Sequence, residues 1–302
     1  MPNWNDILNE LSDSTNTPDG VRRSYLRKLH EITGRNVILY YSGWLDKPNL
    51  SSRGLSAFYV GDPDKTGFMT AVHDLDREKG LDLILHTPGG DVAATESIVH
   101  YLRQMFGCDM RAIVPQLAMS AGTMMACACE QIVMGKHSSL GPIDPQIGGM
   151  AAHGILEEFK EAKDEITKDP RTAAVWQPIV GKYNPTLIGE CRKAISWAET
   201  IVTKWLSSGM FNQGNNTKKK AKKVVKELGD HALTKSHNRH ISSEKAKNIG
   251  LNVLDLENDD DLQDAILSVH HATLLTFSAS NAVKIIENQK GAATIRSVNL
   301  GQ

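Results

Sequence analysis

A stretch of small apolar residues with a serine near its start, Leu117 to Glu130, constrains the fold of this chain more than any other. Upstream of it, Met110 to Pro115 has the pattern of a strand. After Ser120, the residues from Ala121 to Cys129 are small and apolar on every side, which predicts a helix that is buried all round. Ser120 therefore lies where a buried strand gives way to a buried helix.

Two roles fit a serine at this position. Serine is among the residues preferred as the N-cap of a helix, where its hydroxyl accepts a backbone hydrogen bond. The same position is surrounded by unpaired N–H groups at the positive end of the helix dipole, which favours an oxyanion. This stretch alone leaves the N-cap and the nucleophile of an active site both open for Ser120.

A second stretch, Leu81 to Asp91, is a predicted strand that runs into a Pro-Gly-Gly turn, and the helical pattern of Val92 to Met105 follows it. Glycines adopt positive φ and allow close approach, so their N–H groups are able to point into a cleft. The spacing of the two strand–turn–helix units fits adjacent parallel strands, whose carboxyl ends are where open α/β sheets bind ligands. A serine hydroxyl facing a glycine N–H would be a nucleophile beside half of an oxyanion hole.

Three motifs in order resemble those of the ClpP/crotonase superfamily. They are Thr87-Pro-Gly-Gly-Asp91, Met119-Ser-Ala-Gly-Thr123 and Ser138-Ser-Leu-Gly-Pro142. The branch that the chain resembles most is that of signal peptide peptidase A and the serine dehydrogenase proteinases, over roughly Asn36 to Val253. The resemblance implies an α/β fold, a ClpP/crotonase-like spiral of β-β-α units with a helical insert and C-terminal helices.

The same resemblance assigns roles to residues of the motifs. It implies that Ser120 is the nucleophile. The backbone N–H groups of Gly89 and Ala121 would form the oxyanion hole, to which Gly90, the next residue of the glycine turn, also belongs. The segment that follows Ser138 would line the substrate cleft. No cofactor and no metal site is expected.

The general base is the part of the predicted site that the motifs leave open. In the signal-peptide-peptidase branch the base is a lysine, and Lys182 matches the first lysine of the corresponding segment, whereas Asn184 occupies the position aligned with the catalytic one. Lys160 and Lys163 are alternatives, because another subgroup takes its lysine from the helix after the Ser-Leu-Gly segment. A catalytic lysine must be desolvated enough to lower its pKa. Lys182 is the first choice for a Ser-Lys dyad.

Histidines are the other candidates for the base. ClpP-like members place a triad histidine after the serine where this chain has Asp144, so that triad is not carried over. His237 and His240 lie in the late segment that carries the triad acid in the ClpP-like fold. His153 follows the cleft segment, and His86 precedes the Pro-Gly-Gly turn, where packing is the simpler role. For each of these histidines, surface or core packing is the alternative.

Composition excludes several classes of protein. The formal net charge of −1 argues against a chain-wide nucleic-acid binder. The four cysteines show no metal-ligand spacing and no disulfide framework, which favours a reducing cytoplasm. No signal peptide and no apolar run long enough to span a bilayer is recognised. A short lysine-rich run is expected to be a solvated helix face rather than a nucleic-acid, peptide or lipid site: Lys218, Lys219, Lys220, Lys222, Lys223 and Lys226.

The periodicities predict three parts of the chain. These are an N-terminal helical segment (1–34), a catalytic domain (35–256, with the helical insert at about 151–228) and a C-terminal helix and tail (257–302). Helices are expected in the first two parts at Trp4 to Leu11, Pro18 to Thr33, Asp62-Pro63 to Glu78, Ala151 to Lys168 and Pro185 to Leu206, with a helix or turn at Arg171 to Gly181. Within the last part, Asp261 to Glu287 has the pattern of one amphipathic helix, and Gln289 to Gln302 is expected to be loose.

The resemblance, together with these residues, implies a soluble serine peptidase that cleaves peptide bonds through an acyl-enzyme on Ser120. The resemblance also implies a homo-oligomer. One alternative is a crotonase-type acyl-CoA enzyme, in which the same oxyanion hole stabilises an enolate and Asp91 or Asp144 supplies the carboxylate. The other is a non-catalytic oligomeric scaffold that binds peptides. This alternative is favoured because Asn184 stands where the family has its catalytic lysine.

Overall fold

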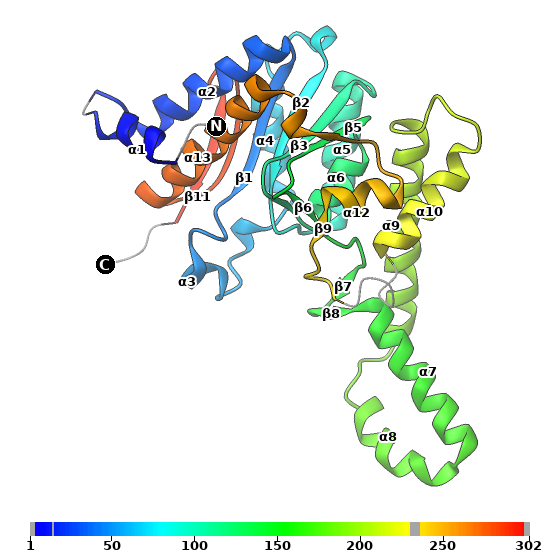
Figure 1. Ribbon diagram of the computed structural model, residues 1–302. Helices are drawn as coiled ribbons and strands as arrows, with labels where there is room; N and C mark the ends of the chain where they lie inside the picture. The colour runs from blue at the N-terminus through cyan, green and yellow to red at the C-terminus, as the bar shows by residue number, and fades with distance from the viewer. Residues whose placement is uncertain (1–3, 14, 230–235, 299–302) are drawn as a thin grey trace.

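The computed structural model describes residues 4–13, 15–229 and 236–298, and it shows a mixed α/β protein built on one central sheet (Figure 1). The strands of this sheet are β1 (Asn36–Ser42), β2 (Leu81–His86), β3 (Met110–Val114), β5 (Gln131–Met134), β10 (Val253–Asp255), β11 (Ala282–Asn288) and β12 (Ala293–Ser297). Their order is β10-β5-β3-β2-β1-β11-β12. The five strands from β10 to β1 are parallel, whereas β11 is antiparallel to β1 and to β12.

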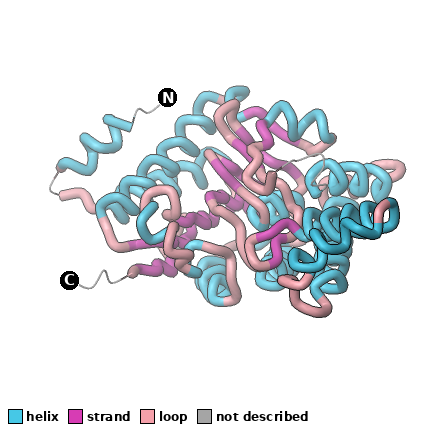
Figure 2. The backbone as a smooth tube through the Cα atoms, turned by 90° about the horizontal axis from the view of Figure 1, so that it is seen from below, coloured by secondary structure: helices cyan, strands magenta, loops and turns pink. Residues whose placement is uncertain are grey.

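Helices cover both faces of the sheet (Figure 2). One face packs against α4 (Pro63–Val72), α5 (Val92–Phe106) and α6 (Ala121–Cys127), and the other against α2 (Pro18–Thr33) and α13 (Asp260–Ala279). Successive side chains of a strand point to opposite faces, so Tyr40 of β1 joins the first core and Tyr41 joins the second. Burial on both faces explains why most residues of β1 and β2 are apolar, and the one buried charge of β2, Asp82, is paired with Arg35 and Arg111.

The N-terminal helices predicted from the sequence are confirmed as α1 (Trp4–Ser12) and α2. The start of α2 is fixed by Thr17, whose side chain accepts the Gly20 N–H, and by Pro18 in the first turn. Gly34 ends the helix with a φ of +67°. These local signals were sufficient to place both ends of α2 in the sequence.

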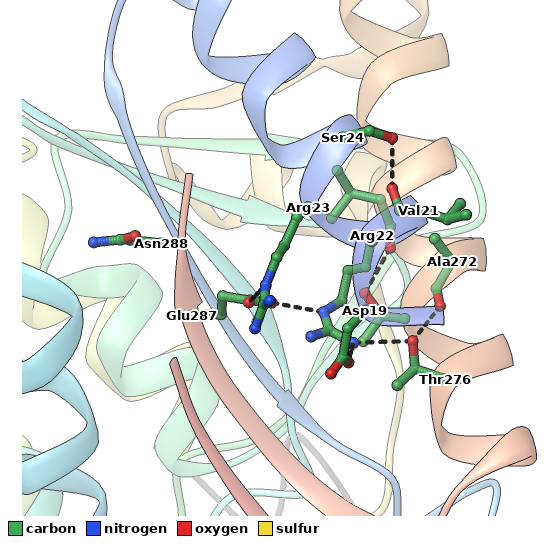
Figure 3. Close-up of polar contacts among 12 residues, drawn as sticks. Asp19, Val21, Arg22, Arg23, Ser24, Ala272, Thr276, Glu287 and Asn288 are labelled. Carbon is green, nitrogen blue, oxygen red and sulfur yellow. Dashed lines mark hydrogen bonds and ion pairs between the residues drawn. The ribbon is translucent and has the colours of Figure 1, made fainter. Parts of the chain in front are cut away.

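A buried ion-pair cluster joins α2 to the sheet and to α13 (Figure 3). Arg22 donates through Nε to Glu287 of β11 at 2.7 Å and through Nη1 to Thr276 of α13 at 3.0 Å, and it also pairs with Asp19 at 2.8 Å. Arg23 binds the second oxygen of Glu287. The side chains of Arg22 and Glu287 are both 0% exposed. Because each would be a costly unpaired charge alone, the cluster specifies how α2 sits on β11.

The helix predicted from Asp261 to Glu287 is wrong beyond Ala279. Helix α13 ends there, and Ala282–Asn288 forms β11, which pairs with β1 inside the main sheet. The expectation of a loose tail from Gln289 is also wrong for Ala293–Ser297, which form β12. The last four residues of the chain lie outside the described residues.

Tertiary contacts explain why this stretch is a strand. The residues of β11 are buried along its whole length, and its two charged side chains find buried partners: Lys284 pairs with Asp64 at 2.8 Å and Glu287 pairs with Arg22. Ile285 and Ile286 then enter the opposite cores of the sheet. The spacing of these apolar residues also fits a helix, so the pattern alone could not distinguish the two.

The helix predicted from Asp62-Pro63 to Glu78 is shorter in the structure. Helix α4 ends at Val72, and a single 3₁₀ turn over Arg77–Lys79 follows it. Asp74, between them, has a φ of +59°, which a continuous helix does not accommodate.

A helical arm extends from the body of the molecule (Figure 1). It begins at the hairpin of β7 (Gln146–Ile147) and β8 (Met150–Ala151) and contains α7 (Ala152–Lys168), α8 (Ala173–Val180) and α9 (Leu187–Ser208). A small apolar cluster of its own includes Ile155 and Cys191. The helices predicted here are confirmed, with α7 and α9 beginning and ending within two residues of the expected positions.

The remaining α-helices of the described residues are α3 (Pro48–Ser51), α10 (Thr217–Gly229) and α12 (Ser243–Ile249), and short 3₁₀ turns occur at Ser56–Phe58, Pro170–Thr172 and Leu256–Asn258. Helix α10 packs against α9 and carries most of the lysine-rich run. Across the described residues, none of the helices combines the length and the apolar character that crossing a bilayer requires.

Replacing Arg22 with alanine is expected to lower the free energy of unfolding by about 3 kcal/mol, because Glu287 would remain buried with only one partner. Urea unfolding followed by circular dichroism measures this. Arg171→Ala is the matched control, since its pair with Asp169 is on the surface, and it should leave the midpoint unchanged. Equal midpoints for both variants would contradict a stabilising role for the cluster.

Candidate active site

Ser120 has a strained backbone conformation at the start of α6. Its φ is +49° and its ψ is −112°, a region that a residue with a side chain rarely adopts. Its carbonyl oxygen accepts the Met124 N–H at 3.0 Å, but its side chain makes no capping hydrogen bond. The hydroxyl therefore does not act as an N-cap. The side chain is partly exposed at the end of a buried strand–helix unit.

The Pro-Gly-Gly turn lies directly against Ser120. Gly89 has a φ of +102°, and a Cβ atom placed on it would lie 2.6 Å from the Cβ of Ser120 and 3.1 Å from the nitrogen of Ala121. A Cβ on Gly90 would lie 2.3 Å from the backbone nitrogen of Val60. Only glycine permits both approaches, so these two residues set the distance between the turn and the serine.

Backbone hydrogen bonds hold the two loops in register. Thr87 donates its N–H to Leu117 at 3.1 Å and accepts the Met119 N–H at 3.0 Å, which ties the strand end before the glycines to the strand end before the serine. On the other side, Val60 donates to the Gly89 carbonyl at 2.8 Å. The loops therefore form one rigid unit at the carboxyl ends of β2 and β3.

The N–H groups of this unit differ in availability. The Gly89 N–H donates to Thr87 Oγ1 at 3.1 Å. By contrast, the N–H groups of Gly90 and Ala121 have no acceptor among the residues that the structure describes. Of the predicted oxyanion-hole residues, Gly90 and Ala121 therefore have N–H groups free to bind an incoming oxygen, while Gly89 supplies the close packing.

A small three-stranded sheet brings distant segments to the same place. It consists of β4 (Leu117–Ala118), β6 (Ser139–Leu140) and β9 (Ile241–Ser242), with β6 in the middle. Strand β4 is parallel to β6 and β9 is antiparallel to it. The residues after β4, those after β6 and those before β9 consequently lie at one end of this sheet, and they include Ser120 and two further polar residues.

Those two residues are Asp144, after β6, and His237, before β9. Asp144 Oδ1 lies 2.8 Å from His237 Nδ1, and Gln146 donates to its other oxygen at 3.0 Å. The Asp144 side chain is fully buried, whereas that of His237 is 24% exposed. A carboxylate at Nδ1 fixes the tautomer that has Nε2 free to accept a proton. Ser120 and His237 are not hydrogen-bonded to each other in this structure.

The sequence indicated both residues but not their pairing. The sequence places Asp144 at the ClpP histidine position and offers it as a carboxylate for the acyl-CoA alternative, whereas His237 is one of several candidate histidines. They are 93 positions apart, and no local spacing connects them. The pairing of β6 with β9 in the structure brings Asp144 and His237 together.

The candidate lysines lie on the arm. Lys160 and Lys163 are exposed on α7, and Lys182 is exposed just after α8. Figure 1 shows α8 at the far end of the arm from α6. Within one chain, the structure does not bring these lysines to Ser120, and the Ser-Lys dyad stays a prediction.

The remaining candidates have other surroundings. Asp91 caps α5, with its carboxylate accepting the Ala94 N–H at 2.7 Å, and His240 is exposed. His86 is fully buried at the end of β2, with its ring centroid 4.4 Å from that of Trp44. Burial lowers the pKa of His86 to about 3. Among the described residues, no group of three or more His, Cys, Asp or Glu side chains is arranged to hold a metal ion.

The fold and the site together define a class of protein: a ClpP-like α/β protein with a serine at a strained strand–helix junction beside a glycine turn. The family model that describes the ClpP-like SDH-type serine proteinases matches residues 21–262. The chain belongs to this family.

Two relatives come from Methanocaldococcus jannaschii. The uncharacterized protein MJ0137 is 31% identical over 190 residues, which are 63% of this chain and 59% of the relative. The uncharacterized protein MJ1495 is 28% identical over 190 residues, which are 63% of this chain and 57% of the relative. The chain thus matches less than two thirds of the length of either protein.

Replacing His86 with leucine is expected to make the protein less sensitive to acid. The folded-state pKa of about 3 lies below the ordinary value of 6.5, so the unfolded chain binds the extra proton as the pH falls below 6.5. This histidine then lowers the free energy of unfolding by about 1.4 kcal/mol for each pH unit down to the folded pKa.

Urea unfolding between about pH 7 and pH 4, the range in which histidine titrates, measures how steeply the free energy of unfolding falls with pH. The His86→Leu protein should lose stability less steeply than the wild type, and the exposed control His73→Gln should match the wild type. If the free energy of unfolding of the wild type and of His86→Leu changes equally with pH, the pKa of His86 is not lowered in the folded protein.

Proposed function

We propose that this chain is a serine peptidase in which Ser120 attacks the peptide carbonyl and the Asp144–His237 pair provides the base. The observation that carries the proposal is the strained, uncapped serine packed on Gly89. The N–H groups of Ala121 and Gly90 beside it have no acceptor among residues 4–13, 15–229 and 236–298. Backbone strain of this kind costs about 1–3 kcal/mol and clusters at functional sites. Membership in the family of SDH-type serine proteinases supports the same reaction class.

The residues then have the following roles. His237 Nε2 accepts the Ser120 proton as Oγ attacks, and the N–H groups of Gly90 and Ala121 stabilise the tetrahedral oxyanion. The imidazolium gives the proton to the leaving amine, which leaves an acyl-enzyme on Ser120. Water, deprotonated by the same histidine, releases the acid product. Asp144 holds the ring through Nδ1 and stabilises its positive charge.

The geometry gives less support to the acyl-CoA alternative. That reaction needs a carboxylate in the cleft, and the two candidates are engaged: Asp91 caps α5, and Asp144 binds His237 and Gln146. A buried carboxylate paired with a histidine at Nδ1 fits acyl transfer by a serine instead.

The proposal includes a homo-oligomer, with the arm as the contact between copies. The arm exposes large apolar side chains: Val175 on α8 is 64% exposed, and Met150 of β8, where the arm begins, is 44% exposed. Exposed apolar residues on a projecting element favour burial against a second copy. In such an assembly, the lysines of the arm would lie near a neighbouring subunit rather than their own serine.

Labelling with a fluorophosphonate probe tests the nucleophile and ranks the bases. Ser120→Ala should lose the label, and mass spectrometry of the wild-type protein should find it on Ser120. His237→Ala and Asp144→Asn should each lower the labelling rate by about 10²–10⁴-fold, the usual contribution of a general base. Lys182→Ala should label at the wild-type rate.

The opposite ranking would return the base to the lysine: loss of labelling in Lys182→Ala with retention in His237→Ala. Circular dichroism of each variant checks that it is folded. If folded and assembled wild-type protein is not labelled, the peptidase proposal is overturned and the peptide-binding scaffold is favoured.

A second prediction tests the contact between Gly89 and Ser120. Gly89→Ala should lower the labelling rate by roughly 10²-fold, because the added Cβ displaces Ser120 by an ångström or so. Gly107→Ala is the matched control: Gly107 also has a positive φ, +63°, but a Cβ there meets no atom within 4 Å. Both variants carry similar backbone strain, so a comparable loss of labelling in the two would show that the contact with Ser120 is unimportant.

A further inference from the structure

A groove with a volume of about 930 Å³ lies between α9 and α10. Lys218, Lys222 and Lys226 line it from α10, and Lys204 faces it from α9. Hydroxyl groups of α9 complete the lining on that side, and His153, at the start of α7, lies at one end. The groove is separate from the residues assigned above to the reaction.

The three lysines of α10 form a row. Their spacing of four residues places them on one face of the helix, over about 12 Å at the rise of an α-helix. The other lysines of the same helix, Lys219, Lys220 and Lys223, point elsewhere and do not line the groove. The run of lysines is therefore divided into a row inside the groove and a set outside it.

The charge of the row is not neutralised within the part of the chain that the structure describes. Within the described residues, the ammonium groups of Lys204, Lys218, Lys222 and Lys226 form no ion pair, and Glu199 is the one carboxylate that lines the groove. Like charges four residues apart destabilise a helix. A helix that presents them to a shared groove is stabilised when a negative ligand binds there.

The groove runs toward the candidate active site. The last turn of α10 is tied to the segment after β6, because the Ile143 N–H donates to the Leu228 carbonyl at 2.9 Å. Ile143 and Pro145, on either side of Asp144, line a small cavity that continues from the groove. The two cavities share three lining residues: His153, Glu199 and Val225.

We propose that this groove binds an acidic segment of the polypeptide that the site cleaves, so the enzyme selects substrates with carboxylates near the scissile bond. The inference rests on the proposed peptidase function. A row of about 12 Å matches roughly four residues of an extended chain. The acidic side chains would lie within a few positions of the bond that Ser120 attacks.

The chemistry of the lining favours a peptide over a nucleic acid. The carboxylate of Glu199 and the hydroxyls of Thr200 and Thr203 are acceptors for peptide N–H groups. Single-stranded nucleic acids bind on stacking platforms of aromatic side chains, and His153 is the one ring among the residues that line this groove.

Binding to Ser120→Ala protein, which cannot turn over a peptide, tests the proposal. Fluorescence anisotropy would compare a fluorescein-labelled peptide of about six glutamates, which in extended form is longer than the row, with its glutamine counterpart. The glutamate peptide should bind, and more weakly as salt is added. The triple variant Lys218→Gln, Lys222→Gln and Lys226→Gln should weaken its binding by about tenfold or more.

The chain supplies its own control. Lys219→Gln, Lys220→Gln and Lys223→Gln remove the same charge from the same helix outside the groove, so this triple variant should bind the glutamate peptide within about twofold of the parent protein. Equal weakening in both triple variants would mean diffuse attraction and would overturn the proposal. The proposal would also be overturned if an oligothymidylate of the same charge bound more tightly than the glutamate peptide and lost its binding in the variant without the row, because the groove would then be a nucleic-acid site.

Fluorophosphonate labelling separates failure of the groove from failure of the peptidase. Labelling of Ser120 in wild-type protein, together with no binding of the glutamate peptide, would overturn acidic recognition and leave the peptidase standing. Row-dependent binding without labelling would support the groove and overturn the peptidase.

Discussion

The close contact between Gly89 and Ser120 is the constraint on which the rest of the site depends. It exists because Thr87 exchanges backbone hydrogen bonds with Leu117 and Met119, which fixes the end of one parallel strand against the end of the next. With no side chain at position 89, the turn lies close enough to hold Ser120 in a strained conformation. The serine hydroxyl then makes no capping hydrogen bond to the helix, and the N–H group of Ala121 beside it has no acceptor in the described part of the chain.

The layers of the fold make this contact rigid. Helices cover both faces of the sheet, and the buried Arg22–Glu287 cluster fastens α2 to a strand that lies beyond β1 (Figure 3). The arm, by contrast, has only a small core of its own and carries exposed apolar side chains. The protein therefore combines a rigid centre, where the candidate chemistry lies, with a projecting element and a charged groove that suit recognition.

Acidic recognition and the candidate chemistry meet at one short segment. Gly141 to Pro145 contributes Asp144 to the histidine pair, and its Ile143 N–H is tied to the end of α10. The small cavity that continues from the lysine groove is lined by the same segment that positions His237. The groove and the candidate site meet there because the end of α10, which packs on α9, is hydrogen-bonded to the segment after β6, and this segment leads into the arm.

The sequence by itself determined the parallel strands, the strand–turn–helix units and Ser120 beside a glycine turn, because periodicity and turn chemistry are local properties. It also located the ends of α2 and α7 closely. It did not decide that Ala282–Asn288 is a strand, since its apolar spacing fits a helix as well, and burial of Lys284 and Glu287 beside partners far along the chain selects the strand. Nor could it join Asp144 to His237, because only the pairing of β6 with β9 brings those residues within hydrogen-bonding distance. The division of the lysines into a groove row and an outer set likewise required the packing of α10 on α9.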